Sequence, residues 1–312
     1  HRDLHSFPTR RSSDLLRMCE AIVQVFDKYG DKKNRNKARF KYVLDKLGLD
    51  KIKELYEEEF AALANKTFPP IEIPKEEFIP NNLEFKINDE FNSDPEFQTW
   101  KNRNTCEQKQ SGYLNVQIKL ALGDITSDKA RTVANVASSL AGGIIVNTVN
   151  QNMMIPWVKN EALSTFYLEL QKIGLHRAGT EEIRDITCCP GSETCNLGIT
   201  ASRGLVKHLN EEMENGFPHS KELDHISIKA SGCPNSCGQH HIASIGFHGG
   251  AKKLNGVLAP HYEILLGGRI DEDKVVFGTS VIKIPAKNAP QATRQVIDSF
   301  KSDKLANESF GE

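Results

Sequence analysis

Two short cysteine loops, Cys189-Pro-Gly-Ser-Glu-Thr-Cys195 and Cys233-Pro-Asn-Ser-Cys237-Gly238, decide how the rest of this chain is interpreted. The first pair of cysteines encloses five residues, the second encloses three, and 37 residues separate the loops. Four thiolates at one site suit a tetrahedral zinc ion or an iron–sulfur cluster. Structural zinc sites usually separate paired cysteines by roughly two to four residues, so the wide first loop favours a 4Fe–4S cluster.

The residues around these loops support a site for an inorganic group. Gly191 and Gly238 would let the backbone approach a bulky inorganic core. Cys195 is expected to open a helix over residues 197–213, whose amino-terminal amides favour a thiolate. Cys188 is expected to pack as a small hydrophobe, and the lone Cys19 and Cys106 receive no chemical role. The competing interpretation, ordinary buried cysteines, is disfavoured because both loops are tight and contain proline.

Composition limits the classes of function. The chain has 312 residues, with 40 Lys and Arg against 41 Asp and Glu and a net charge of −1. This balance argues against a surface made to bind nucleic acid or anionic lipid. No apolar run reaches the roughly 18 to 20 residues that cross a bilayer. Seven cysteines, four of them in the two loops, suit a reducing compartment, so we predict a cytoplasmic protein without membrane or nucleic-acid partners.

The first half of the chain begins with an unusual segment and a helical region. Residues 1–15, HRDLHSFPTRRSSDL, resemble a translated sequencing adapter and are excluded from fold reasoning. Residues 16–66 are predicted to be helical, with an apolar stripe over residues 36–47 that Lys37, Arg39 and Lys41 flank. These cations are expected either to bind an anion or to form a basic face that is exposed to solvent. Residues 67–95 are predicted to be a linker, because Pro69, Pro70, Pro74 and Pro80 prevent a regular helix.

Residues 96–175 are predicted to form a ferredoxin-like half-domain. Apolar and polar residues alternate over 113–120, which indicates a strand with one buried face. Thr126 or Ser127 then caps a helix, residues 144–149 form a second strand, and an amphipathic helix covers 163–173. The resulting β-α-β-α order is half of a ferredoxin-like layer.

Residues 176–312 carry the cysteine loops and are predicted to form a mixed α/β domain. Strands are expected over four segments and a helix near the end of the chain. The segments are 225–230, 242–247, 262–266 and 275–284. The predicted fold class is therefore α+β: a helical segment, a ferredoxin-like half-domain and a mixed α/β domain that binds the cofactors.

At the cysteine loops the chain resembles the siroheme-dependent nitrite and sulfite reductases. That family pairs a C-x₅-C loop with a later G-C-P-N-x-C-G loop, and Gly232 to Gly238 match the second pattern. Three further segments agree with the family, and together they cover most of residues 16–284. They are residues 34–48 (NRNKARFKYVLDKLG), Asn150-Gln151-Asn152 and Leu266-Gly267-Gly268.

The resemblance implies two cofactors and a set of contacts. Cys189, Cys195, Cys233 and Cys237 would hold a 4Fe–4S cluster, and Cys237, as the catalytic residue, would also be the axial ligand of the siroheme iron. Siroheme carries eight carboxylates, whose burial needs cationic partners. The residues predicted to contact siroheme are Lys37, Arg39, Lys41, Asn150, Gln151, Asn235 and Gly238.

Two of these groups have a second interpretation. Asn150 and Gln151 are expected to end a strand near the macrocycle, or else simply to cap a turn. His240 and His241 follow the second loop, and we expect polar roles at the surface or in the core because four thiolates need no imidazole.

The predicted function is that of the carboxyl-terminal half of a six-electron sulfite reductase, which converts sulfite to sulfide. A ferredoxin-type nitrite reductase, which forms ammonia, is the alternative; sulfite is preferred because Pro190 follows the first cysteine, where nitrite reductases more often have Thr. Two other hypotheses remain: a zinc-binding nucleic-acid module that uses the basic segment 32–41, and an electron-transfer protein with a cluster and no heme.

The resemblance also implies partners. Electrons would come from ferredoxin or a flavoprotein, because the chain has no dinucleotide-binding fingerprint of its own. A missing amino-terminal half of the same enzyme would supply further Arg and Lys residues around sulfite or nitrite. We therefore predict that the chain alone is incomplete for catalysis.

Overall fold

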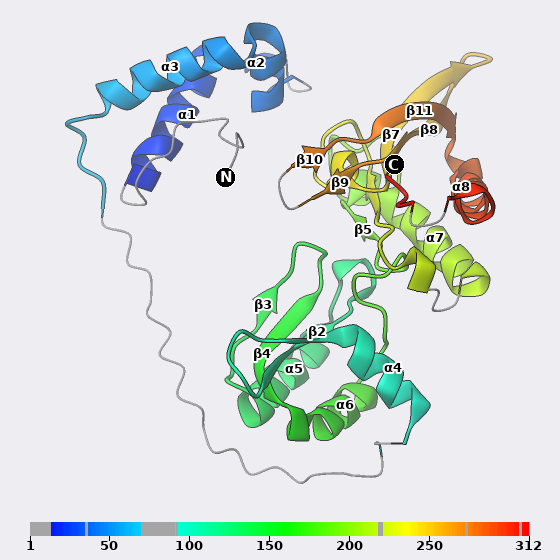
Figure 1. The fold of residues 1–312 in the computed structure, drawn as a ribbon. Coiled ribbons are helices and arrows are strands. Elements are labelled where there is room, and N and C mark those ends of the chain that lie inside the picture. Colours follow the sequence, from blue (N-terminus) through cyan, green and yellow to red (C-terminus); the bar gives the residue numbers. More distant parts are fainter. Residues whose placement is uncertain are drawn as a thin grey trace. The chain divides into compact units, whose positions relative to one another are not determined.

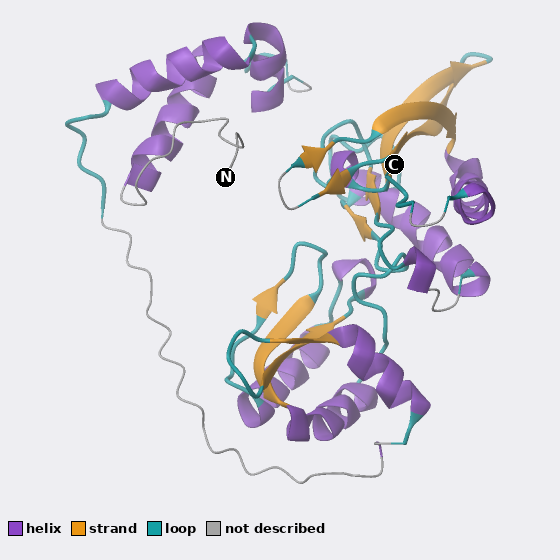
Figure 2. Ribbon diagram, in the orientation of Figure 1, coloured by secondary structure: helices purple, strands orange, loops and turns teal. Residues whose placement is uncertain are grey.

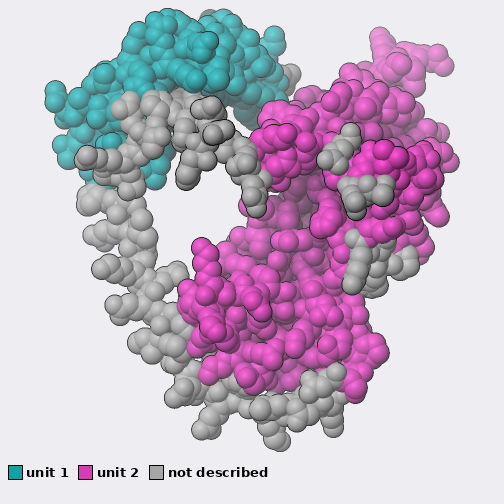
Figure 3. Space-filling view, in the orientation of Figure 1, with its two compact units in different colours: residues 1–77 teal, residues 78–312 magenta. Residues whose placement is uncertain are grey.

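The computed structural model describes residues 14–34, 37–69, 91, 93–217, 221–271, 274–305 and 308–311. The chain divides into two compact units, residues 1–77 and 78–312, which Figure 3 colours separately and which are described one at a time. Residues 1–13 of the adapter-like segment and most of the predicted linker, residues 70–90 and 92, lie outside the described residues. In the part of the chain that the structure describes, no helix is both long and apolar enough to cross a membrane.

The described residues of the first unit form three α-helices. They are α1 (Leu15–Tyr29), α2 (Phe40–Leu47) and α3 (Leu49–Ala62). Val25, Val43, Ile52 and Leu55 form one small buried cluster among these helices. Gly48 separates α2 from α3 with a φ of +78°, a conformation that glycine adopts without strain.

The basic residues of this unit do not line a helix as predicted. The helix α2 begins at Phe40, so Lys37 and Arg39 precede it; the Lys37 N–H closes a turn onto the Asn34 carbonyl, and Arg39 is extended. Both side chains are exposed. Lys41 is the one predicted cation inside α2, and its Nζ lies 5.1 Å from the ring centre of Tyr42. The prediction that all three cations flank an apolar stripe on one helix is therefore wrong, because the turn that precedes α2 extends to residue 39.

The second unit begins with the half-domain, in which three helices and four strands alternate. In chain order these are α4 (Pro95–Asn104), β1 (Thr105–Glu107), β2 (Tyr113–Ile118), α5 (Ser127–Leu140), β3 (Val146–Asn147), β4 (Met153–Lys159) and α6 (Leu163–Lys172). The strands form an antiparallel sheet in the order β1-β2-β4-β3. Figure 1 shows the helices packed on one face of this sheet, where Trp100, Ile118, Ile155 and Phe166 share a core.

The predicted β-α-β-α order missed β4, the main partner of β2, and the strand expected at 144–149 contains only Val146–Asn147. Pro156 and Trp157 form a bulge in β4, where the register against β2 shifts and Trp157 has a φ of +65°. The Gln108 side chain accepts the hydrogen bond of the Trp157 N–H at 2.7 Å. This bulge interrupts the alternation that strand prediction relies on.

The remainder of the unit is a mixed sheet with two long helices. The elements are β5 (Thr187–Cys188), α7 (Ser202–Gly216), β6 (Ile228–Ser231), β7 (Ile245–Leu254), β8 (Val257–Leu266), β11 (Thr279–Pro285) and α8 (Ala289–Asp303). The sheet order is β11-β8-β7-β6-β5, parallel from β5 to β7 and antiparallel beyond. A separate ribbon joins β9 (Arg269–Ile270) to β10 (Val275–Val276), so the strand expected at 275–284 is split.

The apolar faces of α7 and α8 pack with the mixed sheet into one core, which includes Leu209, Phe247, Tyr262 and Ile297. The combination of segregated helices and sheets in Figure 2 confirms the predicted α+β class.

Candidate metal centre

The two cysteine loops begin at the same edge of the mixed sheet. The strands β5 and β6 are parallel neighbours in which Cys188 pairs with Ala230, so their carboxyl ends lie side by side. The Cys189 N–H donates to the Ala230 carbonyl at 3.0 Å. The N–H groups of Ile199 and Thr200 then both donate to the carbonyl of Gly232, at 2.8 and 3.0 Å. Loops 37 residues apart in sequence are thus joined by backbone hydrogen bonds.

Each loop begins with a buried cysteine and ends with an exposed one. Cys189 and Cys233 are each 7% exposed, whereas Cys195 and Cys237 are exposed, and all four are free thiols. The Gly232 N–H donates to the sulfur of Cys189 at 3.1 Å. The sulfur of Cys189 is therefore positioned as a hydrogen-bond acceptor, as the sulfur of an iron ligand would be.

Glycine is required where the loops meet. A Cβ on Gly232 would lie 2.6 Å from the Gly191 Cα and 2.7 Å from the Thr200 carbonyl oxygen. A Cβ on Gly238 would collide with the Ala230 carbonyl oxygen. Both Gly191 and Gly238 thus lie where backbone segments approach each other closely, and their approach to an inorganic core stays a prediction.

Within the described residues, no three His, Cys, Asp or Glu side chains are arranged to hold a single metal ion. The thiolates of a four-iron cluster each bind a different iron atom, so they surround a larger volume than the ligands of one ion. The donor set fits such a cluster in its chemistry: four free thiols on two adjoining loops. Asn235 Oδ1, inside the second loop, is buried and has no hydrogen-bond partner in the described part of the chain.

Two predictions about neighbouring cysteines have different outcomes. Cys195 does not open a helix, because α7 begins only at Ser202, after the two residues 199 and 200 that donate to the Gly232 carbonyl. Cys188 packs as predicted: it is buried in the core, and burial raises the pKa of its thiol to about 12.

Asn150 and Gln151 lie in the turn between β3 and β4, which the Thr148 N–H closes onto the Asn152 carbonyl. They do not end a strand, because β3 stops at Asn147; they occupy a turn, the second of the two interpretations given above. Gln151 Nε2 donates to the Cys188 carbonyl at 2.8 Å, and Gln151 Oε1 accepts from the Cys188 N–H at 3.2 Å. The half-domain thus holds the strand that leads into the first loop.

A buried lysine that the sequence analysis missed lies next to this turn. Lys229 is 7% exposed, and its Nζ donates to Asn150 Oδ1 at 3.0 Å and to Thr187 Oγ1 at 3.3 Å. Burial lowers the pKa of Lys229, and the charge of Asp185 opposes that change. The available signal was a lysine between two apolar residues, Ile228 and Ala230.

Histidines support the second loop, in the polar core role that we considered for them. His240 is fully buried, and its Nδ1 lies 2.8 Å from Ser231 Oγ, which also accepts the Gly238 N–H at 3.1 Å. His241 Nδ1 lies 2.8 Å from Ser236 Oγ, beside Cys237. These contacts fix both ends of the second loop.

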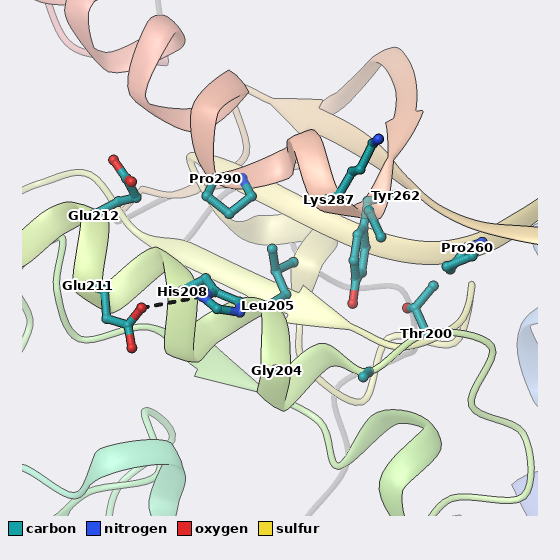
Figure 4. Close-up of a pocket in the computed structure, with 12 residues that line it drawn as sticks. Thr200, Gly204, Leu205, His208, Glu211, Glu212, Pro260, Tyr262, Lys287 and Pro290 are labelled. Atoms are coloured by element: carbon teal, nitrogen blue, oxygen red, sulfur yellow. Dashed lines mark hydrogen bonds and ion pairs between the residues drawn. The ribbon is translucent and has the colours of Figure 1, made fainter.

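A cavity of about 520 Å³ borders this region where α7, β8 and α8 meet, and Figure 4 shows the Tyr262 hydroxyl directed toward Thr200. Burial raises the pKa of Tyr262 to about 12, so the phenol stays neutral. The cavity lining includes none of the four cysteines. Among the predicted siroheme contacts, Asn150, Gln151, Asn235 and Gly238 lie in this unit, whereas Lys37, Arg39 and Lys41 belong to the other unit.

Comparisons with known proteins identify two domains. The "Nitrite and sulphite reductase 4Fe-4S domain" matches residues 3–63 and 179–311, and the "Nitrite/Sulfite reductase ferredoxin-like half domain" matches residues 107–173. The first match begins within the segment that we excluded as adapter-like.

Curated relatives include the ferredoxin–nitrite reductase of Synechococcus elongatus, 24% identical over 91% of this chain and 50% of the relative. The chloroplastic ferredoxin–nitrite reductase of Betula pendula is 27% identical over 89% of this chain and 44% of the relative. The ferredoxin sulfite reductase of Mycobacterium tuberculosis is 24% identical over 94% and 49%. The chain spans about half the length of the curated relatives that it matches.

A solved structure has the same fold. The NirA protein of Mycobacterium tuberculosis superposes with a TM-score of 0.67 at 22% identity, over 98% of this chain and 54% of that one. The two domain matches cover the cysteine loops, the half-domain and the helical segment. The chain therefore belongs to the family of siroheme-dependent nitrite and sulfite reductases, whose cofactors are a 4Fe–4S cluster and siroheme.

Proposed function

We propose that this chain holds the 4Fe–4S cluster and part of the siroheme site of a six-electron reductase that acts on sulfite. The observation that carries the proposal is the junction of the two cysteine loops at the ends of β5 and β6. Four thiolates from these loops would bind the cluster. The hydrogen bond from the Gly232 N–H to the Cys189 sulfur supports the assignment of the first ligand.

The four cysteines would have two different tasks. Cys189 and Cys233 are buried and would anchor the cluster, whereas Cys195 and Cys237 are exposed and would close over it. Cys237 is exposed, so its sulfur would be accessible to siroheme as well as to the cluster. When bound, the cluster and siroheme would supply single electrons and an iron atom for the reduction of the substrate.

The substrate is a small oxyanion that takes up six electrons. Hydrogensulfite with six electrons and six protons gives hydrosulfide and three waters; nitrite with six electrons and eight protons gives ammonium and two waters. Sulfite is our proposal because Pro190 follows the first cysteine. Nitrite is the second candidate, because several of the relatives are named ferredoxin–nitrite reductases. Competition between sulfite and nitrite for the reconstituted chain, followed by the siroheme absorption bands, distinguishes them.

The electron donor is proposed to be ferredoxin, which the names of the relatives contain. Because the chain spans about half of their length, we propose that further residues complete the oxyanion site. The 312-residue chain alone should then reduce sulfite with reduced methyl viologen far more slowly than an intact reductase. The cytoplasmic location stays a prediction, and plant relatives are named as chloroplastic proteins.

The decisive test is the cofactor content of cysteine variants. Cys189→Ser and Cys233→Ser should each lose most of the iron and acid-labile sulfide that the parent chain takes up in anaerobic reconstitution. Cys106→Ser is the matched control, because Cys106 is exposed on β1, outside the loops. Iron that is retained in both loop variants, or a parent chain that binds zinc in place of iron and sulfide, would contradict the proposal.

A further inference from the structure

Ser202 is a buried polar residue that none of the roles above uses. It is the first residue of α7, its side chain is 0% exposed, and its hydroxyl donates to the Cys189 carbonyl at 2.6 Å. The same oxygen lies 3.4 Å from the sulfur of Cys189. Ser202 therefore contacts a proposed cluster ligand from an element that carries no ligand itself.

The first loop is shaped to admit this hydroxyl. Gly191 has a φ of +62°, and a Cβ there would lie 2.7 Å from the Ser202 nitrogen and would collide with its Oγ. The Ser192 N–H donates to the Thr200 carbonyl at 3.0 Å, which folds the loop back onto the start of α7. Any other residue at 191 would displace the serine from the sulfur.

Cys189 is thus approached by two donors on separate elements. The Gly232 N–H is fixed by the backbone and points at the sulfur at 3.1 Å. The Ser202 hydroxyl rotates about one bond, so it can donate its hydrogen bond either to the carbonyl or to the sulfur of Cys189. Once iron replaces the thiol proton, the sulfur can only accept, and a negative sulfur attracts the hydroxyl proton more strongly.

We propose that Ser202 raises the reduction potential of the 4Fe–4S cluster by donating a hydrogen bond to Cys189. This inference rests on the proposed function, which makes Cys189 a cluster ligand. Each electron from the donor protein adds one negative charge to the cluster, so a hydrogen bond to a ligand sulfur stabilises the reduced form more than the oxidised form. Ser202 is a positioning residue, because it acts on the cluster through Cys189.

The test is a redox titration of the reconstituted 312-residue chain and its variants, followed by electron paramagnetic resonance. Ser202→Ala should retain the cluster and shift its midpoint potential to a more negative value than that of the parent. Ser202→Thr, which keeps the hydroxyl, should stay closer to the parent. Ser244→Ala is the matched control, because Ser244 is also buried and its Oγ accepts the Ser227 N–H at 3.1 Å, away from the loops.

A second measurement compares the parent with Ser202→Ala. The iron–thiolate stretching bands of the parent cluster, assembled in D₂O, should shift relative to those in H₂O by more than the bands of Ser202→Ala do, because only the Gly232 N–H remains as an exchangeable donor to the sulfur in the variant. Equal band shifts in the two proteins, or a Ser202→Ala cluster with the parent potential, would overturn this inference and leave the proposed function intact. A parent chain that assembles no cluster would overturn both.

Discussion

The two cysteine loops have the same pattern of cysteine burial but are supported by different contacts. Each begins with a cysteine that is 7% exposed and ends with an exposed one. The second loop is held by its own neighbours, because Ser231 bonds both the Gly238 N–H and His240. The first loop is held from outside, by Gln151 of the half-domain and Ser202 of α7.

This difference shows why the half-domain accompanies the cluster domain. Gln151 is 37 residues from Cys188, yet it satisfies both the N–H and the carbonyl of that residue. Lys229 on β6 reaches the same turn through Asn150. The side chains that support the first loop therefore come from the half-domain and α7, whereas those that support the second loop lie within ten positions of each other.

A substitution at the contact between the two loops should have the largest effect on stability and on cluster uptake. Gly232→Ala places a Cβ 2.6 Å from the Gly191 Cα, so we expect about 3 kcal/mol loss of unfolding free energy and no cluster uptake. Gly250→Ala is the control, since a Cβ there meets no atom within 4 Å. Urea unfolding and iron analysis check both variants, and equal stability of the two would refute the proposed close contact.

The local support of the second loop is tested by Ser231→Ala. The change leaves the Gly238 N–H and the His240 ring nitrogen without their partner, at a cost of about 2 kcal/mol in unfolding free energy. Hydrogen exchange should quicken over residues 233–240 and stay unchanged over 187–195. Ser302→Ala, at an exposed hydroxyl near the end of α8, should have neither effect. Faster exchange in both loops would mean that they are not independently supported.

The external support of the first loop is tested by Gln151→Glu. The carboxylate can still accept from the Cys188 N–H, but it cannot donate to the Cys188 carbonyl and repels that oxygen. We therefore expect a loss of about 1 kcal/mol in unfolding free energy. Hydrogen exchange should now quicken over residues 187–195 alone, the reverse of the Ser231→Ala result. Gln171→Glu, at an exposed position on α6, is the control. An unchanged first loop would argue against support from the half-domain.

The smallest effect is expected from Lys229→Met and depends on pH. Burial lowers the pKa of Lys229 below 10.5, so between its folded pKa and 10.5 the unfolded chain binds more protons than the folded chain. The unfolding free energy of the parent should therefore rise relative to that of Lys229→Met as the pH increases toward 10.5. This gain should be lost as the pH falls through the folded pKa of Lys229. Unfolding midpoints near neutral and alkaline pH measure this, with the exposed Lys207→Met as control. A stability difference that does not vary with pH would contradict it.

Several elements could be predicted because their signals are local. Alternation over residues 113–118 and the Thr126 cap of α5, whose side chain accepts the Lys129 N–H, are sequence patterns that the structure repeats. A signal for α4 was also present, since Asp94 caps it and Pro95 is its first residue. The strand β4 was not predictable from alternation, because the bulge at Pro156 and Trp157 depends on pairing with β2.

The sequence by itself determined the four cysteines, their spacing and the glycines around them, because residue type and short spacing set which chemistry a loop can perform. Only the tertiary structure decided that β5 and β6 are neighbours, and that Gln151 and Ser202 meet Cys188 and Cys189. The physical reason is that strand pairing and contacts of side chains with distant backbone depend on the whole fold, so no local pattern of residues records them.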